Sequence, residues 1–300
     1  MDSLTLDQIQ IFLAIVDEGS FSRAAKRLNR AQSAVTYGIQ KLEAQFDLPL
    51  FDRAAYRPQL TEAGRTLLVR ARRIAEEAGA FRDTARSLAS GLEAELTIVL
   101  DAMFPVPLVV PALQAFTARF PTVPPRIYVD SLGAATELVL NGTGMIGLLP
   151  MMFTDMALLR RFPLTTIELV PVVAAGHPLA AIAGMIATTD LHAHVQLVLT
   201  DRSTATAGRD FGVLSGRTWR IADLGAKQAM LLAGLGWGNM PAHMIAEDVK
   251  RGRLIVIKPA EWHPENARVV MSGAYLADRT LGPAGTWMVQ HLAAGSTGAS

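Results

Sequence analysis

The sequence contains no cysteine among its 300 residues. This absence excludes disulfide bonds, thiolate metal sites, cysteine nucleophiles and thiol-based redox sensing. No apolar run approaches the roughly 18 residues that a membrane-spanning helix needs. The N-terminus, MDSLTLDQIQ, lacks the basic region of a secretory signal peptide. The sequence therefore predicts a cytoplasmic protein without a membrane partner.

The chain also has little net charge, only +1 at pH 7, so it carries no overall attraction for nucleic acid. Basic residues nevertheless cluster near the N-terminus. The segment from Ser20 to Lys41 contains no acidic residue and five basic ones, which are Arg23, Lys26, Arg27, Arg30 and Lys41. Such a segment can contact phosphates, although a solvated helix face would show the same pattern.

The length of the chain suits two domains of unequal size. Within the first of them, apolar spacing predicts three short helices, over Leu6–Glu18, over the residues after Ser20, and over about Gln32–Ala44. The outer face of the third helix carries Gln32, Ser33, Thr36, Tyr37, Gln40 and Lys41. Short polar and amide side chains of this kind contact base edges, so the pair of helices predicts a helix-turn-helix.

The segment GSFSRAAKRLNRAQSAVTYGIQKLEAQFDLPLFDR, followed by LTEAG, resembles the DNA-binding region of LysR-type transcriptional regulators. The resemblance covers about the first 65 residues. It implies two wing strands, at Leu50–Phe51 and Gln59–Leu60. It also implies that Arg53, assisted by Arg57, lies near the minor groove, and that Arg23 and Arg30 contact DNA together with the outer face of the third helix.

Several residues depart from the family pattern. Ala31 stands where a capping serine or threonine is usual, and its absence removes about 0.5 to 2 kcal/mol of helix stabilisation. Asp47 replaces a usual glycine. Tyr37 and Gly38 replace longer polar residues on the expected DNA face, so the family's consensus DNA site does not carry over to this chain.

A long helix is expected from Glu62 to about Ser90, with Thr61 as its cap and Gly91 as its stop. Large apolar residues recur along it every seven positions, at Leu67, Ile74, Phe81 and Leu88. This seam predicts a dimer formed with the same helix of a second subunit. The alternative is a stripe that packs against the chain's own C-terminal domain.

From Leu96 onward, short apolar strands alternate with helical segments, which predicts an open α/β sheet. Two such sets follow one another, so we expect two lobes with a cleft between them. The resemblance to LysR-type regulators continues more loosely through FTARFP, HPLA, GLGWGNMP and GRL. It implies a fold like that of periplasmic solute-binding proteins.

Strand ends nominate the residues of an effector pocket, because ligands in open α/β sheets bind beyond the carboxyl ends of strands. The candidates are Asp101, Ala102, Ser131, Thr200, Asp201, Arg202, Trp237 and Asn239. Asp101 favours an amine, a hydroxyl or a bridging cation in the ligand, unless it pairs with Arg202 or Arg220. Trp237 is expected either to pack or to stack on the ligand.

Nothing in the sequence indicates an enzyme, a metal site or a cofactor. The six histidines show no zinc-ligand or catalytic-triad context. GLGWGNMP lacks the spacing of a dinucleotide-binding loop. A transport-type binding protein is a rival hypothesis, opposed by the DNA-binding segment. A regulator switched by a protein partner without a small ligand remains a second alternative.

The predicted architecture is an α/β protein with an all-α-type winged helix-turn-helix at its N-terminus. We expect a DNA-binding domain over 1–60, a linker helix over 61–90 and a two-lobed periplasmic-binding-protein-like effector domain over 91–300. Lobe I would comprise about 91–163 and 267–300, and lobe II about 164–266. The expected partners are double-stranded promoter DNA, a second copy of the chain as a dimer or dimer of dimers, a small-molecule effector and RNA polymerase.

Overall fold

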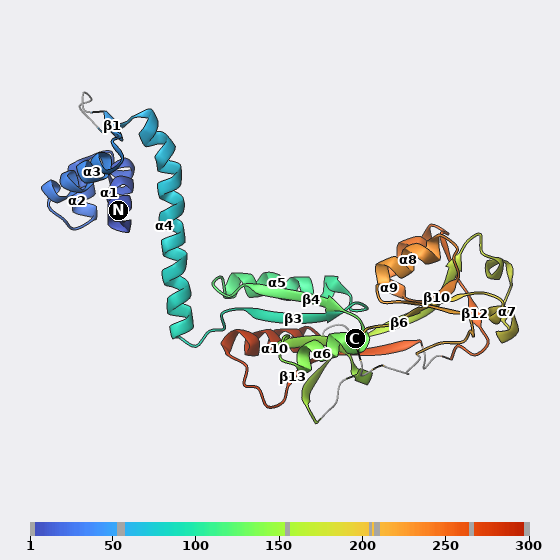
Figure 1. Cartoon of the computed structure of the whole chain (residues 1–300). Coiled ribbons are helices and arrows are strands. Elements are labelled where there is room, and N and C mark those ends of the chain that lie inside the picture. The colour runs from blue at the N-terminus through green and yellow to red at the C-terminus, as the bar shows by residue number, and fades with distance from the viewer. Residues whose placement is uncertain are drawn as a thin grey trace. The chain divides into compact units, whose positions relative to one another are not determined.

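The computed structural model describes residues 4–52, 58–153, 157–203, 206, 211–263 and 267–296. The chain separates into two compact units, Met1–Ala89 and Ser90–Ser300. Figure 1 shows the helical N-terminal unit and the α/β C-terminal unit. Each unit has its own buried core.

The N-terminal unit begins with the three expected helices, α1 (Leu6–Glu18), α2 (Phe21–Arg27) and α3 (Gln32–Phe46). The side chains of Thr5 and Ser20 cap the first two helices by accepting backbone N–H groups. Ala31 precedes α3 without any side-chain cap. Asp47 ends α3 in the left-handed region, at φ 50°, where the family's usual glycine would be unstrained.

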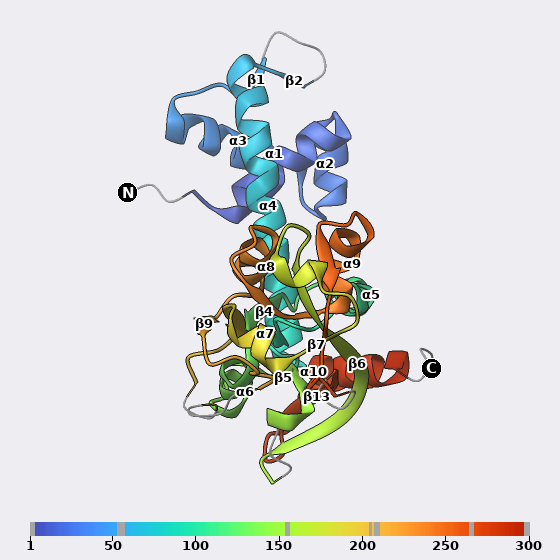
Figure 2. The ribbon, with the colours of Figure 1, turned by 90° about the vertical axis from the view of Figure 1, so that its right-hand side faces the viewer.

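A small wing follows, formed by the antiparallel pair β1 (Phe51–Asp52) and β2 (Gln59–Leu60). Phe51 attaches the wing to the helices through edge-on ring contacts. Its ring centroid lies 5.7 Å from that of Phe12 and 5.8 Å from that of Phe21. Next comes α4 (Glu62–Ala89), which begins beside β2 (Figure 2). The hydroxyl of Thr61 accepts the N–H of Gly64 at 3.0 Å and so caps α4, as the sequence predicts.

The C-terminal unit opens with a parallel arrangement of three strands. These are β3 (Leu96–Asp101), β4 (Pro125–Asp130) and β5 (Ile146–Pro150), connected by α5 (Val106–Arg119) and α6 (Leu132–Leu140). Strand β3 is buried on both faces. Ile98 and Leu100 pack in the cluster that contains α5 and α10 (Pro283–Ser296), whereas Val99 packs in the cluster that contains α6. This first lobe is therefore a sheet between two helical layers.

The two lobes share one strand, β6 (Leu159–Ala174). Residues Leu159–Glu168 pair antiparallel with β13 (Arg268–Leu276) in the first lobe. Residues Leu169–Ala174 pair with β10 (Trp237–Pro241) and β11 (Leu254–Val256) in the second lobe. The sequence predicted only the second part of β6, from Leu169. We call the sheet of β3, β4, β5, β13 and early β6 lobe I, and the sheet of late β6, β8, β9, β10 and β11 lobe II.

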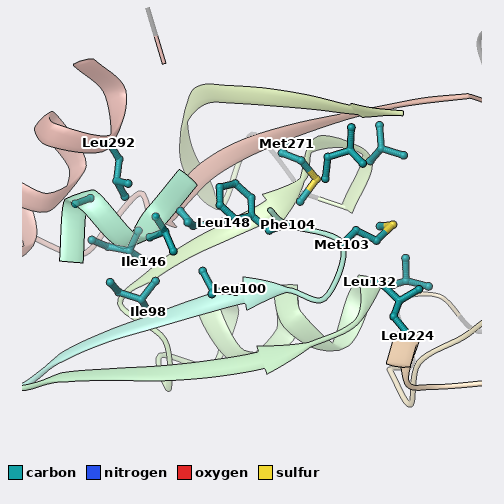
Figure 3. Packing of buried hydrophobic residues seen from close by; sticks show 14 of the residues in the cluster. Ile98, Leu100, Met103, Phe104, Leu132, Ile146, Leu148, Leu224, Met271 and Leu292 are labelled. Atoms are coloured by element: carbon teal, nitrogen blue, oxygen red, sulfur yellow. The ribbon is translucent and has the colours of Figure 1, made fainter. Parts of the chain in front are cut away.

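Lobe II is built around late β6 and the parallel strands β8 (Gln196–Leu199), β9 (Thr218–Ile221) and β10. Its remaining elements are α7 (Thr188–His192), α8 (Leu224–Leu232), α9 (Ala242–Lys250), the short pair β7 (Met185–Ile186) and β12 (Lys258–Pro259), and the 3-10 turn Pro178–Ala181. A second 3-10 turn, Met151–Phe153, follows β5 and belongs to lobe I. The largest buried cluster runs through both lobes. Figure 3 shows Met103, Leu132 and Leu224 gathered at one end of it.

A buried carboxylate fixes the end of β3 in lobe I. Asp101 is only 1% exposed, and its two oxygens accept the N–H groups of Met103 at 2.9 Å and Leu132 at 2.7 Å. Leu132, the first residue of α6, has a φ of 54°, which is strained for a leucine. The hydrogen bond that the Leu132 N–H donates to Asp101 therefore holds the start of α6 in an unfavourable backbone conformation. Burial raises the pKa of Asp101 to about 7, although the two N–H bonds oppose this shift.

Replacing Ala31 with serine is expected to stabilise α3. Residue 31 already has the extended backbone of a helix cap, so a serine hydroxyl can accept a free N–H of the first turn. We expect about 0.5 to 2 kcal/mol of added protection for α3 amides, measured by hydrogen exchange on the full-length protein. Ala34→Ser, inside the first turn, is the control and should give no gain. Equal protection in both variants would contradict the missing cap.

The unfolding free energy should depend on pH through Asp101. Its folded pKa of about 7 lies above the unfolded value of about 3.9, so the folded state holds an extra proton between these limits. Stability from this group is complete below about pH 4 and is lost as pH rises to 7. Urea unfolding followed by tryptophan fluorescence measures it, because all four tryptophans lie in the C-terminal unit.

Asp101→Asn should flatten this pH dependence, whereas Asp278→Asn, an exposed change in the same lobe, should leave it unchanged. The comparison concerns the slope between pH 4.5 and 7.5, because asparagine also alters the hydrogen bonds to Met103 and Leu132. An unchanged slope in Asp101→Asn would show that this carboxyl does not titrate in that range.

Candidate functional sites

The outer face of α3 presents polar side chains to solvent. Gln32, Ser33, Tyr37, Gln40 and Lys41 are all exposed, with Tyr37 at 68%. Thr36 is half-buried, and its hydroxyl donates to the Gln32 carbonyl at 3.0 Å. Five of the six predicted residues of this face are therefore accessible, while the Thr36 hydroxyl already has a partner within the helix.

Gly38 corrects the sequence-based expectation that it replaces a DNA-facing residue. A Cβ at this position would lie 2.5 Å from Cδ1 of Ile11 in α1. The residue faces the neighbouring helix, and glycine permits the close approach of α1 and α3. A glycine inside a helix costs about 1 kcal/mol of helix stability. At this position the glycine is explained by helix packing and not by contact with DNA.

Two predicted DNA-contacting arginines are held by their own domain. Arg30 forms an ion pair with Asp7 at 2.6 Å, and this hydrogen bond lowers the pKa of the Asp7 carboxyl. The guanidinium of Arg23 donates to the main-chain carbonyl of Glu18. Both side chains are exposed at the surface, so these contacts orient them. The predicted wing residues Arg53 and Arg57 lie outside the described residues.

The apolar stripe of α4 has two different environments. Leu67 is half-buried and packs with buried Ala71 against the core of its own N-terminal unit. Ile74 is 37% exposed and lines a small apolar hollow of about 100 Å³ beside Phe12. Phe81 and Leu88 are 76% and 47% exposed. Leu67 thus has an intramolecular partner, whereas the later stripe residues are uncovered in the single chain.

Two of the predicted strand-end residues, Asp201 and Ser131, form hydrogen bonds to the backbone of the opposite lobe. A carboxylate oxygen of Asp201 in lobe II accepts the N–H of Ala134 in α6 at 3.1 Å. In the opposite direction, the hydroxyl of Ser131 donates to the carbonyl of Ala222 at 3.3 Å. A Cβ added at Gly133 would come within 2.8 Å of the Ser203 hydroxyl oxygen. This part of the lobe interface is therefore closely packed.

The other strand-end candidates also have structural environments. Ala102 donates its N–H to the Asp130 carbonyl at 2.8 Å, and Thr200 donates its N–H to the Ile221 carbonyl at 3.0 Å. Arg202 is exposed. Asp101 was expected either to pair with an arginine or to contact the ligand. Instead, its carboxylate accepts two backbone N–H groups and so has a structural role.

A cavity of about 270 Å³ lies beside this packed interface. Its walls come from both lobes, with Met103, Leu132 and Met152 from lobe I facing lobe II. The remaining lining residues are Leu169, Gln196, Leu197, Val198, Leu199, Phe211, Gly212, Lys227, Asn239, Trp262, Arg268 and Val269. Asn239 is the only member of the sequence-predicted effector set among these lining residues.

Trp237, expected near the ligand, lies elsewhere. Its side chain is 0% exposed and packs in a lobe II cluster with Leu179, Ile186 and Leu191. The packing interpretation of this tryptophan is therefore the one that the structure supports. The sequence signal was misleading because a tryptophan in a glycine-rich segment suits both a loop platform and a buried strand.

The polar groups of the cavity differ in how well they are bonded. Gln196 donates one N–H to the Gly212 carbonyl at 2.7 Å, and its amide oxygen accepts the N–H groups of Leu214 and Ser215, so both acceptor positions of that oxygen are used. The amide nitrogen of Asn239 donates to the Gly212 carbonyl at 3.2 Å. Its buried Oδ1 has no partner among the described residues.

Sequence reasoning missed Lys227, a buried lysine in α8. It is 3% exposed, and its ammonium donates to the Asn239 carbonyl at 2.7 Å. Burial lowers the pKa of Lys227 to about 7. A signal was present, because Leu224, Lys227 and Leu231 share one face of the helix. A lysine between two buried leucines on that face indicates a polar group directed at the core.

The described residues contain neither a candidate membrane span nor a candidate metal site. None of their helices is long and apolar enough to span a bilayer. They also contain no group of three or more histidine, aspartate or glutamate side chains arranged to hold a metal ion.

Comparison with known proteins agrees with this architecture. Residues 6–65 match the family model described as bacterial regulatory helix-turn-helix protein, lysR family, and residues 89–296 match the model described as LysR substrate binding domain. The probable HTH-type transcriptional regulator YhaJ of Escherichia coli K12 is 30% identical over 292 residues, which are 97% of this chain and 96% of that protein. The HTH-type transcriptional regulator AceR of Acinetobacter baumannii is 28% identical over 82% of each chain.

A solved structure supports the fold. The Corynebacterium glutamicum OxyR C206 mutant superposes with a TM-score of 0.54 at 20% identity, over 98% of this chain and 93% of that one. The expected order of helix-turn-helix domain, long helix and α/β domain is thereby confirmed, as is the expectation of a regulator rather than an enzyme. The chain belongs to the LysR family and is a LysR-type transcriptional regulator with an effector-binding domain.

Proposed function

We propose that this regulator binds promoter DNA as a homodimer and that a small molecule in the cavity between its lobes alters this binding. The observation that carries the proposal is the cavity itself, whose walls come from both lobes. A ligand that contacts both walls favours one relative position of the lobes over others. Such differential contact is what couples a binding site to a distant activity, typically by about 1 to 3 kcal/mol.

The face of α3 is the proposed reader of sequence. Gln32, Ser33 and Gln40 offer the amide and hydroxyl groups that bond to base edges, and Tyr37 offers an aromatic ring. Lys41, Arg23 and Arg30 are the proposed phosphate contacts. Thr36 contributes through its methyl group, because its hydroxyl is bonded to Gln32. Arg53 and Arg57 keep their proposed role in the wing.

The exposed part of the α4 stripe is the proposed dimer contact. Ile74, Phe81 and Leu88 repeat every seven residues and are uncovered in the single chain. Two copies of α4 would bring together two helix-turn-helix domains for the two halves of an operator. We place the functional boundaries at 1–60, 61–90 and 91–300, and assign the protein to the cytoplasm with RNA polymerase as a further partner.

The effector site is proposed for the cavity and for the strand-end residues that border it. Asn239 would contact the ligand directly. Asp101, Ala102, Ser131, Thr200, Asp201 and Arg202 would respond to it through the lobe interface. Trp237 is left out of this proposal because it is enclosed in the core of lobe II.

Selection of bound duplexes from a random DNA pool tests the function, with full-length protein at physiological salt. We expect enrichment of an inverted repeat with fixed half-site spacing. Gln32→Ala and Gln40→Ala should relax base preference at individual positions, at about 1 to 3 kcal/mol per lost bidentate contact. Lys41→Ala should instead weaken binding to all sequences and reduce the salt slope by about one unit.

Lys26→Ala is a matched control, since Lys26 is an exposed lysine on α2 outside the proposed contact set. The absence of any enriched sequence from a folded protein would contradict specific DNA binding. If Lys41→Ala and Lys26→Ala gave the same salt slope as the parent protein, α3 would not be the helix that approaches the phosphates.

The dimer contact is tested by Phe81→Asp, which places a charge in the middle of the exposed stripe. We expect the mass measured by light scattering to fall toward that of a monomer of 32.2 kDa, because burying an unpaired carboxylate is strongly unfavourable. Val69→Asp is the control, as Val69 is 55% exposed on α4 but lies off the seven-residue repeat. A mass unchanged by Phe81→Asp would assign the dimer to another surface.

A further inference from the structure

Lys227 is a buried amine that has no anionic partner among the described residues. Its single recorded hydrogen bond goes to a neutral acceptor, the carbonyl of Asn239. An ammonium group has three N–H donors, so two of them are unused within the described residues. Leaving such a group under-bonded in a low-dielectric interior is costly, and structural lysines avoid it by pairing. The side chain lines the cavity, where a ligand could supply the missing acceptor.

The charge pattern of the cavity points the same way. Among the described lining residues, which come from α8, β6, β8, β10, β13 and the adjoining loops, Lys227 and Arg268 are the only charged side chains. Both are basic. Arg268 is exposed at the start of β13, whereas Lys227 lies inside. The described part of the lining therefore has basic and no acidic side chains, with Gln196 and Asn239 as neutral polar groups among mainly apolar residues, which favours a ligand with one anionic group.

The packed strand ends, by contrast, disfavour an anion. Asp201 places its own carboxylate at the start of α6, where it accepts the N–H of Ala134. Asp130 and Asp201 both lie close enough to Asp101 to raise its pKa by charge repulsion. An external carboxylate here would displace Asp201 and meet two further acids. The Lys227 side of the cavity is therefore where a negative ligand group is most stable.

The walls define the rest of the ligand. Phe211 and Trp262 supply aromatic surface, and Met103, Leu132 and Val269 supply aliphatic surface. Met side chains adapt to ligands of different shape and contact aromatic rings favourably. The buried Oδ1 of Asn239, which has no partner among the described residues, can accept one hydrogen bond. A flat apolar body with an acidic group and a donor satisfies every part of this lining.

We propose that the effector is a small aromatic or similarly apolar organic anion whose acidic group accepts a hydrogen bond from the ammonium of Lys227. This inference rests on the proposed function, in which the cavity is the effector site. Lys227 is then the residue that selects for charge, and Asn239 the residue that selects for a donor. Neutral and cationic ligands of the same shape leave Lys227 without its acceptor, so they bind more weakly.

Binding of such an anion makes the protein take up a proton at Lys227. Burial lowers the pKa of Lys227 to about 7, so at pH 8 the free protein holds this amine mainly uncharged. A bound anion stabilises the charged form and raises the pKa again. Arg268 is the other charged group described in the cavity. Its positive charge favours the uncharged form of Lys227 both with and without the ligand. Binding at pH 8 is therefore expected to consume up to about one proton, and binding at pH 5.5 almost none.

The experiment uses the full-length protein and a panel of matched compounds. The anions are phenylacetate, indole-3-acetate and 1-naphthoate, each compared with its neutral amide and with an amine of similar shape. Thermal shift identifies binders, and calorimetry in two buffers of different ionisation enthalpy measures affinity and proton uptake. We expect at least one anion to bind about tenfold or more tightly than its amide, with proton uptake at pH 8.

Lys227→Met is expected to remove this preference while preserving the fold, because methionine fills a similar volume without a charge. Lys250→Met, on the exposed surface of α9, is the control and should behave as the parent protein. Proton uptake by the unmodified protein is a second readout. Its persistence in Asp101→Asn would assign the proton to Lys227, because Asp101 also has a pKa of about 7.

The proposal is overturned if no anion of the panel binds, if the amides bind equally well, or if binding at pH 8 takes up no proton. It is also overturned if a folded Lys227→Met protein keeps the preference for anions. A neutral ligand that binds in the cavity and changes operator affinity would overturn the choice of an anion but leave the proposed function intact. Conversely, a protein that binds the anions but no specific DNA sequence would contradict the proposed function and leave the choice of an anion intact.

Discussion

The two lobes of the effector-binding domain depend on one shared strand. β6 pairs with β13 up to Glu168 and with β10 and β11 from Leu169 onward, so one continuous backbone belongs to both sheets. A strand that changes partners in this way joins the two sheets and brings their strand ends face to face, with the cavity beside them. Leu169, the first residue paired in lobe II, also lines the cavity. The position of the cavity therefore follows from the crossing strand.

The strand ends of the two lobes meet in polar contacts beside the cavity, where a ligand can alter them. Hydrogen bonds between the lobes join Asp201 to Ala134, Ser131 to Ala222 and Ser203 to Glu137. Each contributes about 0.5 to 1.5 kcal/mol net, and somewhat more where a carboxylate accepts. Their sum is comparable to the 1 to 3 kcal/mol by which one site usually influences another. The strand-end polar residues thus suit a role in setting the balance between lobe positions, while the ligand-binding groups lie deeper, on α8 and β10.

Local pattern and tertiary environment explain which parts of the molecule could be predicted from the sequence. The three N-terminal helices, the cap of α2 at Ser20, the cap of α4 at Thr61 and the missing cap at Ala31 depend on neighbouring residues, and the structure confirms them. Early β6 was missed because Arg160, Arg161 and Pro163 interrupt its apolar pattern, and because its partner β13 lies 100 or more positions away in the sequence. The cavity was misplaced for a related reason. Strand ends predict where lobes meet, but only side-chain packing shows that Asp201 fills that position and that Lys227, in an apparently ordinary helix, lies beside the open space.

The seven-residue repeat of α4 links the DNA-binding core to the proposed dimer. Leu67 and Ala71 pack against the N-terminal core and so fix the rotation of α4 about its own axis. Because Ile74, Phe81 and Leu88 follow Leu67 at intervals of seven, that rotation also fixes the direction in which they point. A side chain such as Phe81, 76% exposed, gains about 1.5 to 3 kcal/mol when it is fully buried. The first turns of α4 thus determine which face the later turns offer to a partner, and a dimer formed on that face holds each α3 at a defined angle to the seam.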